Sequence, residues 1–326
     1  MIISRTPLRM SFVGGGSDLP GFYRKHGGAV VSTAINKYVY VNVNKKFDTG
    51  IRVAYSKTEE VDSVAQIEHP LVRASLEHLQ IDGGIEITTI ADIPSKGTGL
   101  GSSSSFTVGL LHALSAFKGQ YISSDRLGKD SCHVEIDLCK EPIGKQDQYA
   151  AAFGGLNLIE FKDDDSVIVS PVICNRTTIE ALEAHVLLFY TGVTRSASNL
   201  LKQQAQGIDS DETKQRTVKR MVDLAYTLRA ELQRNNIAVF GEILHENWVL
   251  KRSIAPDITT ENIDNWYNTA RRAGALGGKI LGAGAGGFLM LFAPPDSHQP
   301  IKAALQMLRP VDVRFETQGS QIIFYQ

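Results

Sequence analysis

Glycine is concentrated at three places along this chain of 326 residues. Thirteen of the 29 glycines lie in the segments 14–16, 97–101 and 274–287. Glycine tolerates a positive φ and lets the backbone come close to a ligand. Tight turns use glycine as well, but polar residues stand beside all three segments. The distribution therefore favours a fold in which three loops, far apart in sequence, contribute to a binding site.

Composition and charge exclude several classes of protein. The 34 basic and 35 acidic residues give a net charge of −1, so no basic excess is available for nucleic acid or a membrane surface. No apolar run approaches the ~20 residues of a membrane-spanning helix, and residues 1–12 lack the pattern of a secretory leader. Three cysteines without a CxxC pair favour neither a disulfide framework nor a zinc site. We therefore expect a cytoplasmic enzyme with small-molecule partners, without nucleic-acid or membrane partners, for which a homodimer is possible.

The periodicity of apolar residues predicts a mixture of strands and helices. Val39, Val41 and Val43 alternate with other residues inside 28–47, which is typical of a strand. From Ser103 onward the apolar spacing is helical. Other helices are expected at 18–26, 124–139, 145–153, 211–235, 237–252, 260–273 and 297–308. Because no regular strand–helix–strand period is visible, we predict an α+β chain in two layers rather than a doubly wound sheet.

The length, about twice that of a typical domain, predicts two domains. A polar stretch within 171–183 precedes an apolar strand, HVLLFY, and is the expected boundary. We accordingly predict an N-terminal domain over 1–178 and a C-terminal domain over 179–326.

The segment PSKGTGLGSSSS, residues 94–105, has the character of a phosphate-binding loop. It lies between a predicted strand and a strong predicted helix. Free N–H groups and the positive dipole end at a helix N-terminus attract anions, and serine hydroxyls can contact phosphate or magnesium. A serine-capped helix after a flexible loop is the alternative. The candidate ATP-binding residues are Pro94, Lys96, Gly97, Gly99, Leu100, Gly101, Ser102, Ser103 and Ser104.

Other nucleotide and hydrolase motifs are missing from the sequence. No GxxxxGK[ST] occurs, which excludes a P-loop. The GxGxxG match at 282–287 precedes the apolar strand FLMLF, whereas a dinucleotide-binding fold needs a helix there. HENWV at 245–249 lacks the second histidine of a zinc protease, and no GxSxG is present.

Three motifs in this order resemble the GHMP kinases, the family of galactokinase, homoserine kinase, mevalonate kinase and phosphomevalonate kinase. They are RTPLR at 5–9 with GGGSD at 14–18, the loop at 94–105, and KILGAGAGG at 279–287. The resemblance implies a GHMP kinase fold with an N-terminal domain like domain 2 of ribosomal protein S5. It also implies a ferredoxin-like C-terminal domain and an active site in the cleft between the two.

Within the family, GGGSD, GKQDQYAAAFGG at 144–155 and FYTGVTRSA at 189–197 resemble the D-glycero-D-manno-heptose 7-phosphate 1-kinases. That resemblance implies transfer of the γ-phosphoryl group of ATP, with Mg²⁺, to the anomeric C1 hydroxyl. The product would be the 1,7-bisphosphate for nucleotide-heptose synthesis. Galactokinase has Gly-Glu-His where this chain has Gly14 to Gly16, which argues against galactose. A kinase for another sugar such as L-fucose, or a non-catalytic ATP- and sugar-binding sensor, stays open.

The resemblance also implies roles for polar residues near the reaction. Asp147 matches the catalytic aspartate that accepts the proton of the sugar hydroxyl, although a helix-capping role is the alternative. Arg9 matches a cation near the transferred phosphate. Glu135 and Ser103 are the predicted magnesium ligands, since Mg²⁺ binds few protein groups and otherwise takes phosphate oxygens and water.

A second group of residues is predicted to bind the sugar phosphate. Asp18 matches an aspartate that holds sugar hydroxyls in galactokinase, although it could cap the helix at 18–26 instead. The candidates by type for a second anion site are Arg195, Lys145, Arg24 and Lys25. Arg195 is preferred because it precedes a predicted helix. The candidate substrate-binding residues are Gly15, Gly16, Ser17, Asp18, Arg195, Gly284 and Gly286.

Overall fold

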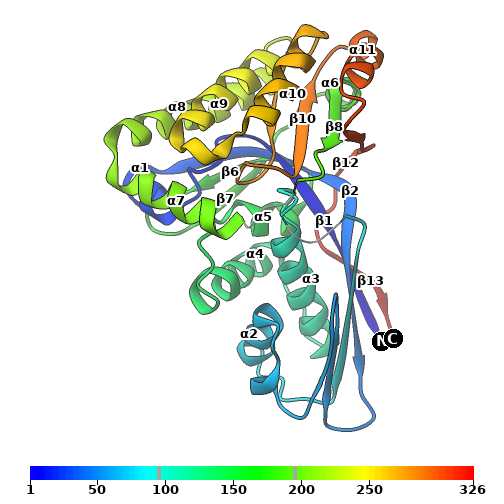
Figure 1. Ribbon diagram of the computed structural model, residues 1–326. Helices are drawn as coiled ribbons and strands as arrows, with labels where there is room; N and C mark the ends of the chain where they lie inside the picture. The colour runs from blue at the N-terminus through cyan, green and yellow to red at the C-terminus, as the bar shows by residue number, and fades with distance from the viewer. Residues whose placement is uncertain (94–96, 194–196) are drawn as a thin grey trace.

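The computed structural model describes residues 1–93, 97–193 and 197–326, with residues 197–199 in backbone only. Its larger sheet has nine strands (Figure 1). Along the main path they are β13 (Gln321–Tyr325), β1 (Ile2–Val13), β2 (Gly28–Lys45), β5 (Ile85–Ala91), β3 (Ile51–Ala54) and β4 (Thr58–Val61). Off this path, β2 also pairs with β12 (Phe315–Glu316) and β6 (Leu156–Phe161), and β6 pairs with β7 (Val167–Pro171).

The two longest strands, β1 and β2, are covered on both faces where they are most apolar. Residues 6–13 of β1 and 28–35 of β2 are all buried. Helices α3 (Ser102–Phe117) and α5 (Gln146–Phe153) pack against both strands from one side. Helix α8 (Glu212–Gln233) contacts both from the other side, together with α9 (Phe240–Ile254) on β1 (Figure 1). Strands buried on both faces are mostly apolar, and residues 28–35 of β2 largely follow that rule. Strand β1 departs from it, because its buried half also contains Thr6, Arg9 and Ser11.

The smaller sheet has four antiparallel strands. Their order is β11 (Arg309–Pro310), β8 (Val186–Tyr190), β10 (Phe288–Phe292) and β9 (Gly277–Ile280). Numbered along the chain within this sheet, the spatial order is 4-1-3-2, which is the ferredoxin-like order. The predicted α+β class is confirmed.

The remaining helices surround the two sheets. Those of the first half are α1 (Pro20–His26), α2 (Pro70–His78), α4 (Ser124–Cys132) and a π-helical turn at His133–Leu138. Those of the second half are α6 (Arg176–His185), α7 (Ala197–Ser210), α10 (Glu261–Arg272) and α11 (His298–Ala304).

The sequence-based prediction missed two parts of the fold. Residues 51–78 contain β3, β4 and α2, for which no element was predicted. The polar stretch chosen as a boundary is largely helix, α6, because Thr178 and Leu182 lie one turn apart and are both buried. The larger sheet also contains strands from both ends of the chain, because β12 and β13 pair with β2 and β1.

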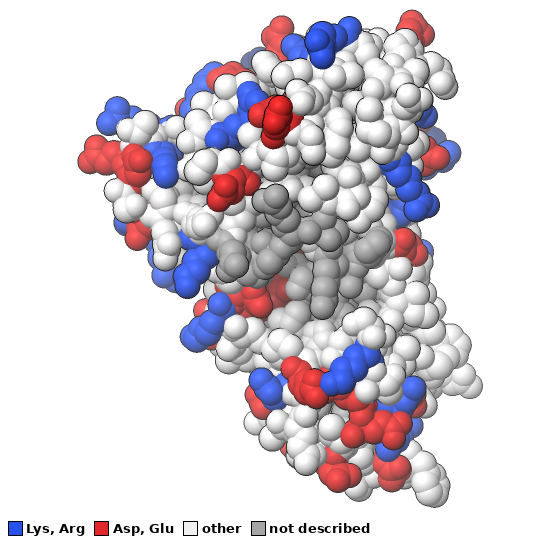
Figure 2. Space-filling view, viewed as in Figure 1, with Lys and Arg blue, Asp and Glu red and all other residues white. Residues whose placement is uncertain are grey.

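The two chain ends lie side by side (Figure 1). The N-terminal ammonium of Met1 donates to the carbonyl of Gln326 at 2.8 Å. On the face drawn in Figure 2, basic and acidic side chains are interspersed. Among the described residues, no helix has the length and apolar character required to cross a membrane.

Candidate active site

A cavity of about 890 Å³ opens where the glycine-rich segments meet. Its wall combines segments from both halves of the chain. They contribute Arg9, Ser11, Gly15, Gly16 and Asp18; Gly97 to Gly99 and Gly101 to Ser104; Gly144, Gln146 and Asp147; and Lys251, Lys279, Gly282 and Ala283. Most of the residues predicted from sequence to bind ATP or sugar therefore face one space.

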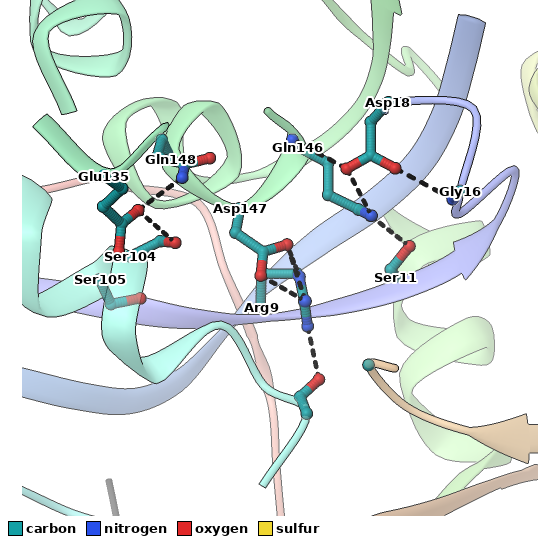
Figure 3. A network of polar contacts seen from close by, with 12 residues as sticks. Arg9, Ser11, Gly16, Asp18, Ser104, Ser105, Glu135, Gln146, Asp147 and Gln148 are labelled. Carbon is teal, nitrogen blue, oxygen red and sulfur yellow. Dashed lines mark hydrogen bonds and ion pairs between the residues drawn. The ribbon is translucent and has the colours of Figure 1, made fainter. Parts of the chain in front are cut away.

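The first turn of α5 organises the polar groups of this cavity. Its consecutive residues Gln146, Asp147 and Gln148 each join a different cluster, as Figure 3 shows. Successive residues of a helix point about 100° apart, so one turn can hold three separate partners. The clusters are centred on Asp18, Arg9 and Glu135 respectively.

Asp147 forms a two-point ion pair with Arg9 of β1. Nε of Arg9 donates to Oδ1 at 2.7 Å, and Nη2 donates to Oδ2 at 2.8 Å. Nη1 of Arg9 donates at 2.7 Å to the carbonyl of Gly99 in the glycine-rich loop. Side-chain exposure is 4% for Arg9 and 24% for Asp147, so the carboxylate keeps access to the cavity while the guanidinium is buried. The pair places a carboxylate and a guanidinium beside the N-terminus of α3.

Glu135 is fully buried behind the start of α3. The hydroxyls of Ser103 and Ser104 donate to its carboxylate at 3.1 and 2.7 Å, and Nε2 of Gln148 donates at 2.5 Å. Glu135 belongs to the π-helical turn at His133–Leu138, a feature often found at functional sites. Burial raises the pKa of Glu135 to about 7, with a contribution from the charge of Asp147, against the lowering effect of the three hydrogen bonds.

The surroundings of Glu135 provide part of a magnesium site, in which Glu135 is buried behind the cavity wall and Ser103 is the predicted ligand that lines it. One carboxylate and two hydroxyls are hard oxygen donors, and Ser103 also lines the cavity, where phosphate oxygens could complete the coordination. A cation would favour the ionised carboxylate that burial disfavours. Among the described residues, no cluster of three or more His, Cys, Asp or Glu side chains could hold a metal. The fit is therefore to an ion that takes most of its ligands from substrate and water.

Asp18 is buried at the end of the N-terminal glycine segment. Its carboxylate accepts from the N–H of Gly16 at 3.0 Å and from Nε2 of Gln146 at 3.0 Å. Gln146 in turn accepts from the hydroxyl of Ser11 at 2.8 Å. Burial and the nearby charge of Asp147 raise the pKa of Asp18. Gly144 makes this packing possible, because a Cβ there would lie 2.0 Å from Oδ2 of Asp18.

The glycine-rich loop and the C-terminal glycine loop pack backbone to backbone. A Cβ on Gly99 would lie 2.2 Å from the carbonyl oxygen of Leu281, and one on Gly287 would lie 2.4 Å from that of Thr98. Gly99 and Gly287 both have positive φ, at 76° and 85°. Glycine at these positions is thus explained by the contact between the two loops.

Several predicted site residues are not on the described cavity wall. Gly284 and Gly286 pack against Ile258 and Val193 instead. Ser17 is buried and exchanges hydrogen bonds with the backbone of Ala29. Leu100 is in the hydrophobic core, and its carbonyl accepts from the N–H of Arg9. Pro94, Lys96 and Arg195 lie outside the described residues.

Comparison with known families decides the identity of this fold. The family description "GHMP kinases N terminal domain" matches residues 66–155, and "GHMP kinases C terminal" matches residues 228–309. Together the matches cover more than half of the chain. The chain belongs to the GHMP kinase family. The predicted family and the predicted fold are both confirmed.

Relatives of this GHMP kinase include enzymes that act on heptose and fucose. The D-glycero-alpha-D-manno-heptose 7-phosphate kinase of Campylobacter jejuni is 28% identical over 94% of this chain and 93% of its own length. The bifunctional fucokinase/GDP-fucose pyrophosphorylase of Arabidopsis thaliana is 26% identical over 88% of this chain, but over only 29% of that longer protein. These likenesses identify the GHMP kinase as an ATP-dependent sugar kinase, that is, a phosphotransferase with an alcohol acceptor.

Solved structures of the same fold cover this GHMP kinase from end to end. A D-glycero-D-manno-heptose 1-phosphate kinase from Bacteroides thetaiotaomicron aligns with a TM-score of 0.83 at 26% identity and covers 100% of both chains. A mevalonate kinase aligns with a TM-score of 0.73 at 20% identity over 97% of this chain, which is evidence for the fold alone.

Two buried lysines from the C-terminal half of the GHMP kinase line the cavity. Lys279, on β9, is the first residue of the motif KILGAGAGG. Its Nζ donates to the carbonyls of Ser11 and Phe12 at 2.8 and 3.1 Å. Lys251, on α9, was not singled out from the sequence. The signal was available, because Asn247, Trp248, Lys251 and Ile254 follow the buried stripe of an amphipathic helix.

Another part of the cavity wall is apolar and aromatic. Tyr55, His69 and Phe106 line it. The ring centroid of His69 lies 4.8 Å from that of Tyr55 and 5.3 Å from that of Phe106. Val39 and Leu71 lie on the same wall. No motif in the sequence identified this surface, because its residues come from β2, from the unpredicted segment 51–78 and from α3.

Proposed function

We propose that this GHMP kinase phosphorylates D-glycero-D-manno-heptose 7-phosphate at its anomeric C1 hydroxyl, using ATP and Mg²⁺ in the cytoplasm. The product is the 1,7-bisphosphate, a precursor for nucleotide-heptose synthesis. The proposal rests above all on the heptose 7-phosphate kinase relative, whose likeness extends over 94% of this chain. The ion pair of Arg9 and Asp147 beside the glycine-rich loop supplies the chemistry.

In the proposed reaction, Asp147 is the general base. Its carboxylate accepts the proton of the C1 hydroxyl as that oxygen forms a bond to the γ-phosphorus. The bond from the γ-phosphorus to its bridging oxygen breaks, and ADP leaves with the electron pair. Arg9 neutralises charge on the moving phosphoryl group and is held in position by the carbonyl of Gly99.

The nucleotide is proposed to span two parts of the cavity. Its phosphates bind the N–H groups at the start of α3, including those of Gly101 to Ser104, where the helix dipole is positive. The adenine ring lies against the apolar wall of Tyr55, His69 and Phe106, whose aromatic faces suit a flat base. Glu135 and Ser103 hold Mg²⁺, which when bound neutralises phosphate charge.

The sugar is proposed to lie against Gly15 and Gly16 with its hydroxyls at Asp18. Both glycines and Asp18 line the cavity, and the carboxylate of Asp18 is oriented by Gln146 and Gly16. Arg195 remains the preferred partner for the 7-phosphate on sequence grounds.

The test is ADP release with ATP and Mg²⁺ across a set of acceptors. The set contains the heptose 7-phosphate, the unphosphorylated heptose, L-fucose, galactose and mevalonate. We expect turnover of the heptose 7-phosphate alone, with NMR of the product showing phosphate on C1. Turnover of L-fucose, together with no turnover of the heptose 7-phosphate, would refute the proposed substrate. ATP binding without ADP release on any acceptor would refute catalysis and favour a sensor.

A further inference from the structure

Lys251 is a buried cation on the cavity wall for which the reaction above names no role. It is on α9, and only 5% of the residue is exposed. Its Nζ donates to the carbonyl of Gly282 in the C-terminal glycine loop. The same residue lines the cavity, so its side chain connects that loop with the space where substrates would bind.

The carbonyl that Lys251 contacts lies where the two glycine loops touch. A Cβ on Gly282 would come within 2.4 Å of the Cα of Gly99. The carbonyl of Gly99 is in turn the acceptor for Nη1 of Arg9, at 2.7 Å. Two cations, Arg9 from β1 and Lys251 from α9, therefore bind carbonyls of adjoining residues at one junction. That junction borders the glycine-rich loop and Asp147.

Lys251 differs in its partners from Arg9 and Lys279, the two other cations on the described part of the cavity wall. Arg9 is paired with Asp147, and Lys279 donates to two backbone carbonyls. Within the described parts of the chain, Lys251 has no carboxylate within ion-pair distance and one hydrogen-bond acceptor, the carbonyl of Gly282. An ammonium has three N–H donors, so two remain for a ligand in the cavity.

The charges that face Lys251 favour an anionic ligand. They are Arg9, Lys279, Asp18 and Asp147. Within the described residues, and with Lys251 itself, this makes three cations and two carboxylates, of which Asp147 already accepts two bonds from Arg9. Burial and the charge of Arg9 lower the pKa of Lys251 to about 8, against the raising effect of Asp18 and Asp147.

We propose that Lys251 is a further catalytic residue, whose ammonium contacts the γ-phosphoryl group of ATP during its transfer. The inference rests on the proposed kinase reaction but not on the identity of the sugar. The γ-phosphoryl group is favoured over the 7-phosphate because Lys251 lies at the contact of Gly282 and Gly99, beside Arg9 and Asp147, where transfer takes place. Lys251 thus brings a donor from the C-terminal half to a reaction otherwise served by the N-terminal half.

The test compares Lys251→Met with Lys219→Met, which removes an exposed lysine from α8 as a matched control. We expect Lys251→Met to lower kcat about 10²- to 10³-fold on whichever acceptor the wild type phosphorylates, with the acceptor KM changed little. Lys219→Met should match the wild type. A kcat for Lys251→Met that equals that of the control would overturn the proposal.

A second measurement needs no sugar and so remains valid if the proposed substrate is wrong. Calorimetry with Mg²⁺ compares the affinities for ADP and for the non-hydrolysable analogue AMP-PNP. We expect Lys251→Met to weaken AMP-PNP about 10- to 100-fold and to leave ADP unchanged, because only AMP-PNP carries a γ-phosphoryl group. Equal weakening of both, or of neither, would contradict a γ-phosphoryl contact.

Two further outcomes separate this role from others. If Lys251→Met raises only the KM for phosphorylated acceptors, the lysine binds the sugar's own phosphate and the proposal fails. If the variant has a lower melting temperature and Lys251→Arg does not restore kcat, the role is structural. We expect the melting temperature to stay level or rise, since an unpaired buried charge is removed, and Lys251→Arg to recover part of kcat.

Discussion

Asp147 would serve the proposed reaction in two ways. It is the proposed base, and it also fixes the guanidinium of Arg9 through two hydrogen bonds. Removing its charge should therefore impair proton transfer and leave Arg9 less well held. Since both effects act at the reacting atoms, they should appear in kcat rather than in binding of ATP.

We predict that Asp147→Asn lowers kcat about 10²- to 10⁴-fold, the range for loss of a general base. The KM for ATP should change little, because the N–H groups of the glycine-rich loop are untouched. Steady-state kinetics with Asp163→Asn as a control, from the exposed β6–β7 turn, checks this. A variant with more than a tenth of wild-type kcat would rule out Asp147 as the base.

Glu135 should make the stability of the magnesium-free protein depend on pH. Burial raises its pKa from 4.5 to about 7. Between these values the unfolded chain has lost the proton that the folded protein still holds, so the free energy of unfolding falls as pH rises. For a shift of this size the loss is about 3 kcal/mol, and it is complete above pH 7.

Urea unfolding of wild type and Glu135→Gln at pH 4.5 to 8, without nucleotide or Mg²⁺, measures this effect. We expect the stability of the wild type relative to the variant to fall by about 3 kcal/mol across that range. A constant difference would mean that Glu135 is not the buried acid described above. Added Mg²⁺ and ATP should offset the fall, because a bound cation favours the ionised carboxylate.

At the scale of elements, the site depends on how closely two loops approach. Gly99 lies against Leu281 and Gly282, so the glycine-rich loop is supported by a segment about 180 residues away in sequence. The positive φ of Gly99, 76°, would by itself make alanine unfavourable there. The two contributions can be separated, because Gly119 has φ of 69° and a Cβ added to it would meet no atom within 4 Å.

We predict that Gly99→Ala destabilises the protein and raises the KM for ATP, whereas Gly119→Ala only destabilises it. Both variants carry the strain of a positive φ, on the order of 1–2 kcal/mol. Only Gly99→Ala also forces a Cβ to within 2.2 Å of the carbonyl oxygen of Leu281, which must separate the loops. Thermal unfolding and ATP kinetics of the two variants check this. Similar values of both quantities would show that the loop contact contributes nothing.

At the scale of the whole molecule, the last segment of the chain supports the first half. Strand β13 covers the edge of β1. The residues before β13 support α5 and the turn after it. The N–H of Ser320 donates to the carbonyl of Ala151 in α5, and the N–H of Gly155, just after α5, donates to the carbonyl of Glu316. Because α5 carries Gln146, Asp147 and Gln148, the end of the chain helps position the polar clusters of the cavity.

Two truncations should separate these roles. Removing residues 321–326 uncovers the edge of β1, so we expect a lower melting temperature and a tendency to aggregate, with kcat of the folded protein retained. Removing residues 315–326 also deletes the brace on α5, so kcat should fall as well. Differential scanning calorimetry and kinetics below the melting transition distinguish the two. Equal kcat in both truncations would show that α5 needs no brace.

The sequence by itself predicted the α+β class, and its three motifs were sufficient to indicate the GHMP kinase family. The candidate roles of Arg9, Asp18 and Asp147 came from those motifs, and that of Glu135 from its spacing before Asp147. The α+β class follows from the periodicity of apolar residues, whereas the family and the roles follow from the resemblance of short motifs. The same local signals predicted a helix from Ser103, one residue after the observed start of α3 at Ser102.

Only the tertiary structure decided which groups meet. Gln146 and Gln148 looked alike in sequence, yet one orients Asp18 and the other donates to the buried Glu135. Lys251 reaches the cavity because α9 packs against β1 and β9. Gly284 and Gly286 were predicted to bind substrate, but they pack against other parts of the backbone. Periodicity specifies which face of an element is buried, whereas the partner of each side chain depends on contacts between segments far apart in the chain.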